Sequence, residues 1–314
     1  MQGLVLRTTG SWYRVKTLQG DILDCRLRGN YRLRGNKQTN PIAVGDNVEF
    51  SLQEDGTGLI SDVLDRRNYI VRRATKLSKQ THVVAANIDL LCIVATVGFP
   101  RTSTGFIDRL LVTAEAYHIP ACLILNKVDL YGSYSDGRWY LDPEQEESQL
   151  HQYYAELYRQ VGYPVLEVSA QKGYGVDAVR EMMKDKTVLF SGHSGVGKSA
   201  LLNALDPNLD LRVGEVSDWS LKGKHTTTFA ELFPFAGGYL IDSPGIKEFG
   251  IVDFRGEELS HFFPEMRQLL HQCHFSTCTH THEPHCAIKQ AVEEGTIAEE
   301  RYINYLNILK SINE

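Results

Sequence analysis

The glycine-rich segment Gly192–Ser199 has the residue types and spacing of a phosphate-binding loop, G-x-x-x-x-G-K-S. It follows an apolar segment at 187–191 and precedes a helical pattern, which is the context that such a loop requires. Glycines let backbone N–H groups surround phosphate oxygens, and the N-terminus of the following helix favours negative charge. We expect Lys198 to contact the β- and γ-phosphates of a nucleotide and the Ser199 hydroxyl to bind Mg²⁺. The predicted loop contacts are Gly192, His193, Ser194, Gly195, Val196, Gly197, Lys198, Ser199 and Ala200.

Two short motifs could recognise the base. Residues 126–129, N-K-V-D, follow an apolar segment and resemble the N-K-x-D guanine-recognition motif, and the S-A pair at 169–170 resembles the element whose backbone amide donates to guanine O6. An aspartate carboxylate can accept from both the ring N–H and the exocyclic amine of guanine, and adenine lacks this pair of donors. The asparagine would bond the other base edge and neighbouring loops, and the lysine stem would lie on the ring. The predicted base contacts are Asn126, Lys127, Val128, Asp129, Ser169 and Ala170.

Two further segments could bind Mg²⁺ and sense the γ-phosphate. Asp242 begins a D-S-P-G sequence that resembles D-x-x-G, so we expect Asp242 to hold Mg²⁺ through water and the Gly245 amide to contact the γ-phosphate. An ordinary strand-to-turn junction is the alternative, because Asp, Pro and Gly are all common there. One of the three threonines at 226–228 could complete the Mg²⁺ shell, and we favour Thr228 or Thr227 over Thr226.

The order of these motifs is itself informative. In ordinary GTPases the phosphate loop comes first and the base-recognition motifs come last. Here the base-recognition motifs begin at 126 and 169, before the phosphate loop at 192 and the D-S-P-G sequence at 242. This order predicts a circular permutation, which a parallel sheet tolerates because its core does not depend on where the chain starts. The segment after D-S-P-G is then joined directly to an element that senses the nucleotide.

A cluster near the C-terminus, C-x4-C-x-H-x5-C, could bind zinc. Three thiolates and one imidazole make a closed tetrahedral set, which is typical of a structural site. Ordinary surface cysteines and histidines are the alternative, and His274, His282 and His285 are further candidates for the fourth ligand. The predicted ligands are Cys273, Cys278, His280 and Cys286.

The segments around these motifs predict three domains. Residues 1–72 contain five short strand patterns with turn residues between them, as expected for an OB-fold barrel: Gly3–Arg7, Tyr13–Thr17, Ile22–Leu27, Asn47–Leu52 and Gly58–Val63. Residues 73–252 alternate apolar strand patterns with helical ones, which predicts an α/β domain with a mostly parallel sheet. Residues 253–314 are mainly helical around the cysteine cluster. A polar insertion at 131–147 is given no function.

Composition and charge narrow the class of protein. The chain of 314 residues is 42% hydrophobic and 23% charged, and no apolar stretch is long enough for a membrane helix. We therefore expect a cytoplasmic protein without a membrane partner. The formal net charge is -6, yet the first 76 residues are net basic. Their arginines, with Tyr31 among them, suit RNA phosphates and bases.

Together these motifs make the chain similar to the ribosome small subunit-dependent GTPase A family. Further patterns that carry the resemblance are V-G-D at 44–46, N-I-D at 87–89, I-D-R at 107–109 and H-T-T-T at 225–228. The resemblance implies an N-terminal OB-fold, a permuted GTPase domain and a C-terminal zinc domain. It also implies slow GTP hydrolysis that the 30S subunit stimulates, 16S rRNA binding, and a role late in small-subunit maturation. We expect a monomer that binds GTP and GDP with Mg²⁺ and holds one structural zinc ion.

The sequence offers two candidates for the catalytic group that acts on the attacking water. Ile246 follows D-S-P-G, where many GTPases have the glutamine that orients the attacking water. In the family a histidine of the switch loop has been proposed for this task, which here would be His225. His193, inside the phosphate loop, is a second candidate. Two alternative functions are another permuted GTPase and a GTP-dependent RNA-binding module that does not act on the 30S subunit.

Overall fold

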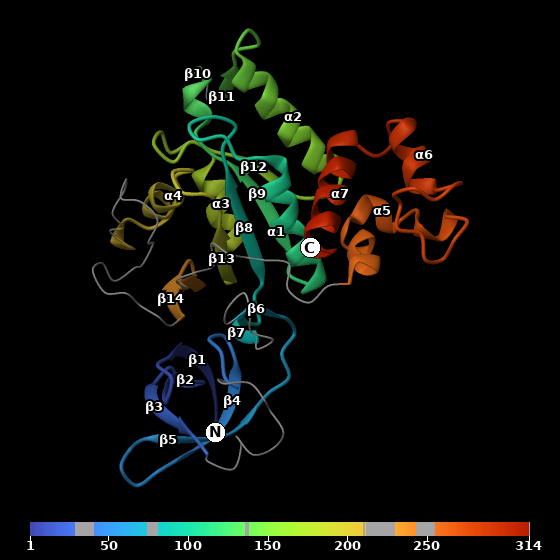
Figure 1. Ribbon diagram of the computed structural model, residues 1–314. Coiled ribbons are helices and arrows are strands. Elements are labelled where there is room, and N and C mark those ends of the chain that lie inside the picture. Colours follow the sequence, from blue (N-terminus) through green and yellow to red (C-terminus); the bar gives the residue numbers. More distant parts are fainter. Residues whose placement is uncertain are drawn as a thin grey trace.

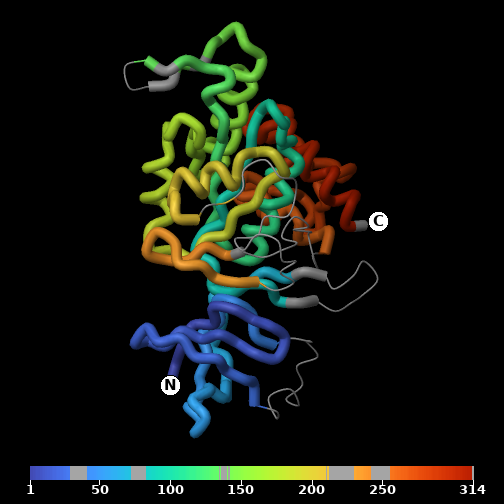
Figure 2. Tube along the Cα trace, turned by 90° about the vertical axis from the view of Figure 1, so that its left-hand side faces the viewer, coloured from blue at the N-terminus to red at the C-terminus, as the bar shows by residue number. Residues whose placement is uncertain are grey.

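Figure 1 shows the computed structural model, which has a strand-rich region at one end, a central α/β region, and a helical region beside it. The hairpin of β10 (Gly132–Ser135) and β11 (Arg138–Leu141) lies at the end opposite the strand-rich region in both views (Figures 1 and 2). The structure describes residues 1–28, 41–73, 81–135, 138–209, 211, 230–242 and 255–313.

The N-terminal strands form a small closed barrel. Their order is β1-β2-β3-β5-β4, and β1 also pairs with β4, which closes the ring. All neighbours are antiparallel except β3 and β5, which are parallel. This confirms the predicted OB-like barrel, and each predicted strand is present with nearly the expected bounds. The strands are β1 (Gln2–Thr8), β2 (Trp12–Thr17), β3 (Ile22–Leu27), β4 (Asn47–Leu52) and β5 (Gly58–Val63).

The central sheet has five neighbouring parallel strands in the order β12-β9-β8-β13-β15. Strand β14 pairs antiparallel with β15 on one side and with β1 of the barrel on the other, where Arg7 lies opposite Glu231. The barrel and the central sheet are therefore continuous through hydrogen-bonded strands. The strands are β8 (Leu90–Ala95), β9 (Ala121–Leu125), β12 (Val165–Glu167), β13 (Thr187–Ser191), β14 (Glu231–Phe235) and β15 (Gly238–Asp242).

Helices cover both faces of this sheet. All six residues of β8 are buried; alternate ones pack with α1 and α2 on one face and with α3 and α4 on the other. Burial on both faces explains the continuous apolar pattern of this strand. Ser103 caps α1 by accepting from the Phe106 N–H, so the helix begins at Thr104. The helices are α1 (Thr104–Ala116), α2 (Glu146–Gln160), α3 (Val176–Met183) and α4 (Lys198–Leu205), with short 3-10 turns η2 (Val128–Leu130) and η3 (Pro207–Leu209).

Two hairpins lie outside this sheet. One pairs β6 (Tyr69–Arg73) with β7 (Thr81–Ala86) between the barrel and the central strands. The other pairs β10 (Gly132–Ser135) with β11 (Arg138–Leu141) inside the segment expected to be a polar insertion. The insertion thus has regular structure, which its polar composition did not indicate.

The C-terminal residues form a helical region against α1. Its core, which includes Val112 of α1, is built around Leu259, Phe263, Met266 and Tyr305. Figure 1 shows α7 in red beside α1. The elements are η5 (Gly256–Phe262), α5 (Pro264–Arg267), η6 (Leu270–Gln272), α6 (Ala287–Glu293) and α7 (Glu299–Asn313). Within the described ranges, no helix has the length and apolar character needed to cross a membrane.

Candidate nucleotide site and metal centre

The phosphate-loop sequence forms the turn between β13 and α4, at the carboxyl end of the parallel strands. Gly192, Gly195 and Gly197 have φ angles of 151°, 82° and 91°, a region that glycine adopts without strain. A Cβ atom on Gly197 would lie 2.4 Å from Asn126 Nδ2, and one on Gly192 would lie 2.3 Å from the Val94 carbonyl oxygen. Both backbone conformation and space therefore require glycine at 192 and 197.

Lys198 begins α4 and folds back over the loop. Its ammonium donates to the carbonyl oxygens of Gly192 and His193, at 2.6 Å each. These bonds place a positive charge inside the curve of the loop, beside the N-terminus of a helix. Such an arrangement of charge and dipole suits phosphate oxygens.

Asn126 joins the two predicted base-recognition motifs to the phosphate loop. Its buried side chain donates through Nδ2 to the Val196 carbonyl oxygen at 2.9 Å and accepts through Oδ1 from the Ala170 N–H at 3.2 Å. The motif predicts that Asn126 contacts neighbouring loops, and these bonds identify the two loops. Segments 44 and 70 residues away from Asn126 thus meet at one side chain.

Lys127 and Asp129 lie on either side of the buried Val128. Lys127 has a left-handed φ of 67°, and its ammonium donates to the Phe99 and Gly195 carbonyl oxygens at 2.5 and 2.7 Å. Burial lowers the pKa of Lys127, against the opposing effect of Asp129. The Phe99 contact was not predicted, because a backbone carbonyl carries no signal in the residue type.

Asp129 and Ser169 connect the two base-recognition motifs directly. Ser169 Oγ donates to Asp129 Oδ1 at 2.5 Å and accepts from the Lys172 N–H at 3.1 Å. The structure therefore brings residues 126–129, 169–170 and 192–199 together at one edge of the sheet. This is the topological position at which open α/β sheets bind ligands.

The predicted Mg²⁺ and switch residues are described only in part. Asp242 ends β15, and its neighbour Ile241 pairs with Leu189 of β13, so the backbone at 242 ends beside the strand that leads into the phosphate loop. The Asp242 side chain, Gly245, the threonines at 226–228 and His225 lie outside the described residues.

His193, the second catalytic candidate, contacts α1. Its ring stacks on Phe106 with centroids 3.7 Å apart and an interplanar angle of 28°. Burial, and then the charge of Lys198, lower the pKa of His193. Both rings line a cleft of about 340 Å³ that extends to Asn304 and Asn307 of α7. The phosphate loop thus contacts the C-terminal region through α1.

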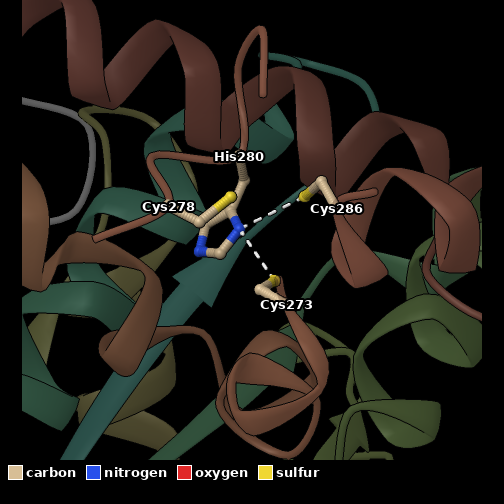
Figure 3. A group of neighbouring side chains, drawn as sticks. All are labelled: Cys273, Cys278, His280 and Cys286. Carbon is tan, nitrogen blue, oxygen red and sulfur yellow. Dashed lines mark hydrogen bonds between the residues drawn. The ribbon is translucent and has the colours of Figure 1, made fainter. Parts of the chain in front are cut away.

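The four predicted metal ligands converge, as Figure 3 shows. One ligand atom from each of Cys273, Cys278, His280 and Cys286 lies within 4.8 Å of the other three. His280 Nδ1 lies 3.6 Å from Cys273 Sγ and 3.4 Å from Cys286 Sγ. A tetrahedral zinc ion with ordinary bond lengths needs sulfur–nitrogen separations of about 3.5 Å. The donor set and its spacing therefore fit zinc.

Nearby bonds hold this cluster against the last helix. Tyr302 and Tyr305 of α7 donate to the carbonyl oxygens of His280 and Thr279, at 2.6 and 2.7 Å. His280 has a left-handed φ of 59°, so the turn that carries the imidazole is unusual for a residue with a side chain. A closed set of ligands without an open position supports a structural role.

The comparisons with known proteins agree with this geometry. The sequence model of the RsgA GTPase matches residues 63–252, and that of the RsgA N-terminal domain matches residues 2–60. A relative from Bacteroides fragilis, named small ribosomal subunit biogenesis GTPase RsgA, is 50% identical over 100% of this chain and 98% of its own. One with the same name from Flavobacterium psychrophilum is 46% identical over 100% and 94%.

Two solved structures match nearly the whole chain. The crystal structure of YjeQ from Thermotoga maritima matches with a TM-score of 0.78 and 37% identity, covering 99% of this chain and 97% of that one. The structure of YloQ, described as a circularly permuted GTPase, matches with a TM-score of 0.76 and 30% identity, covering 99% and 94%. Circular permutation of a GTPase domain thus explains both the rotated motif order and the β12-β9-β8-β13-β15 sheet. The chain belongs to the RsgA GTPase family.

Proposed function

We propose that this enzyme hydrolyses GTP to GDP and phosphate during late maturation of the small ribosomal subunit, and that the 30S subunit stimulates the reaction. The observation that carries the proposal is the Asn126 side chain, which bonds both the phosphate loop and the S-A element. One set of hydrogen bonds therefore couples the region expected to bind the base to the region expected to bind phosphate. The names of the full-length relatives support the ribosomal role.

In this proposal the base lies against residues 126–129 and 169–170, and the phosphates lie in the loop at 192–200. Asp129 supplies the guanine-selective carboxylate, and Lys198 neutralises the phosphates. Ser199, Thr228 and Asp242 hold the Mg²⁺ ion, which polarises the phosphate and offsets its charge. The Gly245 amide senses the γ-phosphate.

We assign to His225 the task of orienting or activating the water that attacks the γ-phosphate. Because the position after D-S-P-G is Ile246, the usual glutamine is not available to orient that water. An imidazole can accept a proton near neutral pH, which suits a group that positions or activates water. Weak intrinsic turnover follows if His225 reaches its working position only on the ribosome.

The barrel is proposed to bind 16S rRNA. The Arg26 guanidinium of β3 lies over the Trp12 ring of β2, 3.8 Å from the ring centroid. Beside Trp12 is a cleft of about 350 Å³ whose lining includes Arg7 and Arg14. An aromatic ring among guanidinium groups suits base stacking and phosphate contact. Three further basic residues of this domain, Arg32, Arg34 and Lys37, lie outside the described residues.

We further propose the domain division 1–72, 73–252 and 253–314, with a monomer that works in the cytoplasm. The zinc ion stabilises the last domain, which follows the D-S-P-G segment in the chain. A change at the γ-phosphate can then reach the surfaces that flank the GTPase domain. Nucleotide state would in this way control the affinity for the small subunit.

The direct test is steady-state phosphate release from GTP with and without purified 30S subunits. We expect slow turnover alone and strong stimulation by 30S, with the Trp12→Ala variant showing less stimulation but the same intrinsic rate. Absence of stimulation by 30S, together with normal GTP binding, would show that the chain is a permuted GTPase with another partner.

A further inference from the structure

A second connection between the base-recognition motifs lies behind the predicted base site. Tyr131 lies two residues after the N-K-V-D motif, is the C-cap residue of η2 and is 1% exposed. Two side chains of α2 hold it: Ser148 Oγ donates to the Tyr131 carbonyl oxygen at 2.5 Å, and His151 Nδ1 lies 2.9 Å from the Tyr131 hydroxyl. Positions 148 and 151 are one turn apart on the same helix face, so α2 holds both ends of the tyrosine.

The other side of the His151 ring faces the strand that leads into the S-A element. His151 Nε2 lies 3.1 Å from Glu167 Oε2, a contact at ion-pair distance in which this nitrogen makes no hydrogen bond. Glu167 ends β12, two residues before Ser169, and also accepts from Arg159 at 2.6 Å. Contact with His151, and then with Arg159, lowers the pKa of Glu167 to about 2 although burial opposes this.

The two motifs are therefore connected twice. At the site itself, Ser169 Oγ bonds Asp129 at 2.5 Å. Behind it, the chain of side chains Tyr131–His151–Glu167 joins the ends of the same two segments. Because His151 is 1% exposed, water cannot easily replace its bond to Tyr131. Loss of that bond would leave a buried ring nitrogen without its partner and release the end of the N-K-V-D loop.

We propose that Tyr131 and His151 are positioning residues for guanine recognition, and that they act by fixing Asp129 relative to Ser169 and Ala170. The inference rests on the proposed role of Asp129 in base binding. Neither side chain touches the base in this account. Both set the distance between two elements that must contact the base together, where a displacement of about 1 Å is already costly.

The test is the Tyr131→Phe variant, which removes only the hydroxyl group. Its matched control is Tyr163→Phe, which removes a buried hydroxyl that donates to Glu115 at 3.2 Å in the same domain. We expect Tyr131→Phe to weaken binding of fluorescent GDP by about three- to tenfold, the value of one hydrogen bond, and the control to stay within twofold. The KM for GTP should rise by the same factor while kcat at saturating GTP is retained, because the phosphate loop is not altered.

The Asp129→Asn variant separates this inference from the proposed function. If Asp129→Asn weakens GDP binding but Tyr131→Phe does not, the positioning role is wrong and base recognition stands. If Asp129→Asn leaves GDP affinity unchanged, the proposed base site itself fails. Equal losses in Tyr131→Phe and Tyr163→Phe, or a lower kcat with unchanged KM, would also overturn the positioning role.

Discussion

The contact between α1 and α7 depends on one buried cation, Arg301, and this gives a quantitative prediction. The Arg301 guanidinium is 1% exposed; it donates to Asp108 Oδ1 at 2.5 Å and to both carboxylate oxygens of Glu265, at 2.7 and 3.1 Å. Asp108 is fully buried. The Arg301→Ala variant therefore leaves a carboxylate inside the interface without its counter-charge.

The expected cost is at the lower end of the range for breaking a buried ion pair, about 3 kcal/mol. The cost is not higher because two hydrogen bonds remain: Asp108 still accepts from Tyr158 at 2.9 Å and from Asn304 at 2.7 Å. The Asp108→Asn variant is the matched comparison, because it removes the charge and keeps Arg301 paired with Glu265. We expect that variant to cost about 1 kcal/mol, the value of one hydrogen bond.

Amide hydrogen exchange measures this locally, which avoids treating several domains as one unfolding unit. A loss of about 3 kcal/mol predicts roughly 100-fold faster exchange in α7 of Arg301→Ala, with the barrel strands β1–β5 unchanged as an internal control. Exchange in α7 within threefold of the wild-type rate would refute the reasoning. Equal acceleration in the barrel would show a global rather than a local effect.

Three further predictions concern the nucleotide site, the metal and pH. Gly197→Ala should abolish GDP binding in a fluorescence titration, because its Cβ would lie 2.4 Å from Asn126 Nδ2 at a φ of 91°; retained affinity would contradict the geometry. A strong chelator, or Cys278→Ser, should release one zinc ion per chain by elemental analysis and speed exchange in α6 and α7; a zinc-free protein with normal protection would exclude a structural ion. Since the pKa of Glu167 falls from 4.5 to about 2, its ionised form stabilises the fold above pH 4.5, and this contribution is lost as pH falls toward 2. Glu167→Gln should flatten that part of the stability curve in acid unfolding, and an unchanged curve would contradict it.

Much of the fold follows from local sequence pattern. Strand β9 and helix α2 are examples: the continuous apolar run at 121–125 indicates a strand buried on both faces, and 3.6-residue periodicity indicates a helix over 146–160. Strand β14 was not predicted, since Glu231–Phe235 is short and contains a proline, which is tolerated because β1 pairs with β14 only at Glu231. The β10–β11 hairpin was missed because its strands are only four residues each and lie among glycine, serine and aspartate residues typical of turns.

The residues of the candidate site that belong to a sequence motif were predictable, whereas its contacts between distant segments were not. The phosphate loop, the N-K-V-D motif and the cysteine cluster are each recognisable from spacing alone. The bond from Asn126 to Val196 and the Tyr131–His151 contact join segments 70 and 20 residues apart, and no local pattern encodes them. The same is true of Arg301. Arginine is usually exposed, but this side chain is buried against Asp108 of α1.

A crystal structure of the protein with a non-hydrolysable GTP analogue and Mg²⁺ would show whether the separated motifs form one nucleotide site. We expect the guanine edge to contact Asp129 and the Ala170 N–H, with the phosphates inside the loop at 192–199 and Mg²⁺ on Ser199. A base held elsewhere, or phosphates outside this loop, would contradict the claim that motifs in rotated order assemble one GTP site.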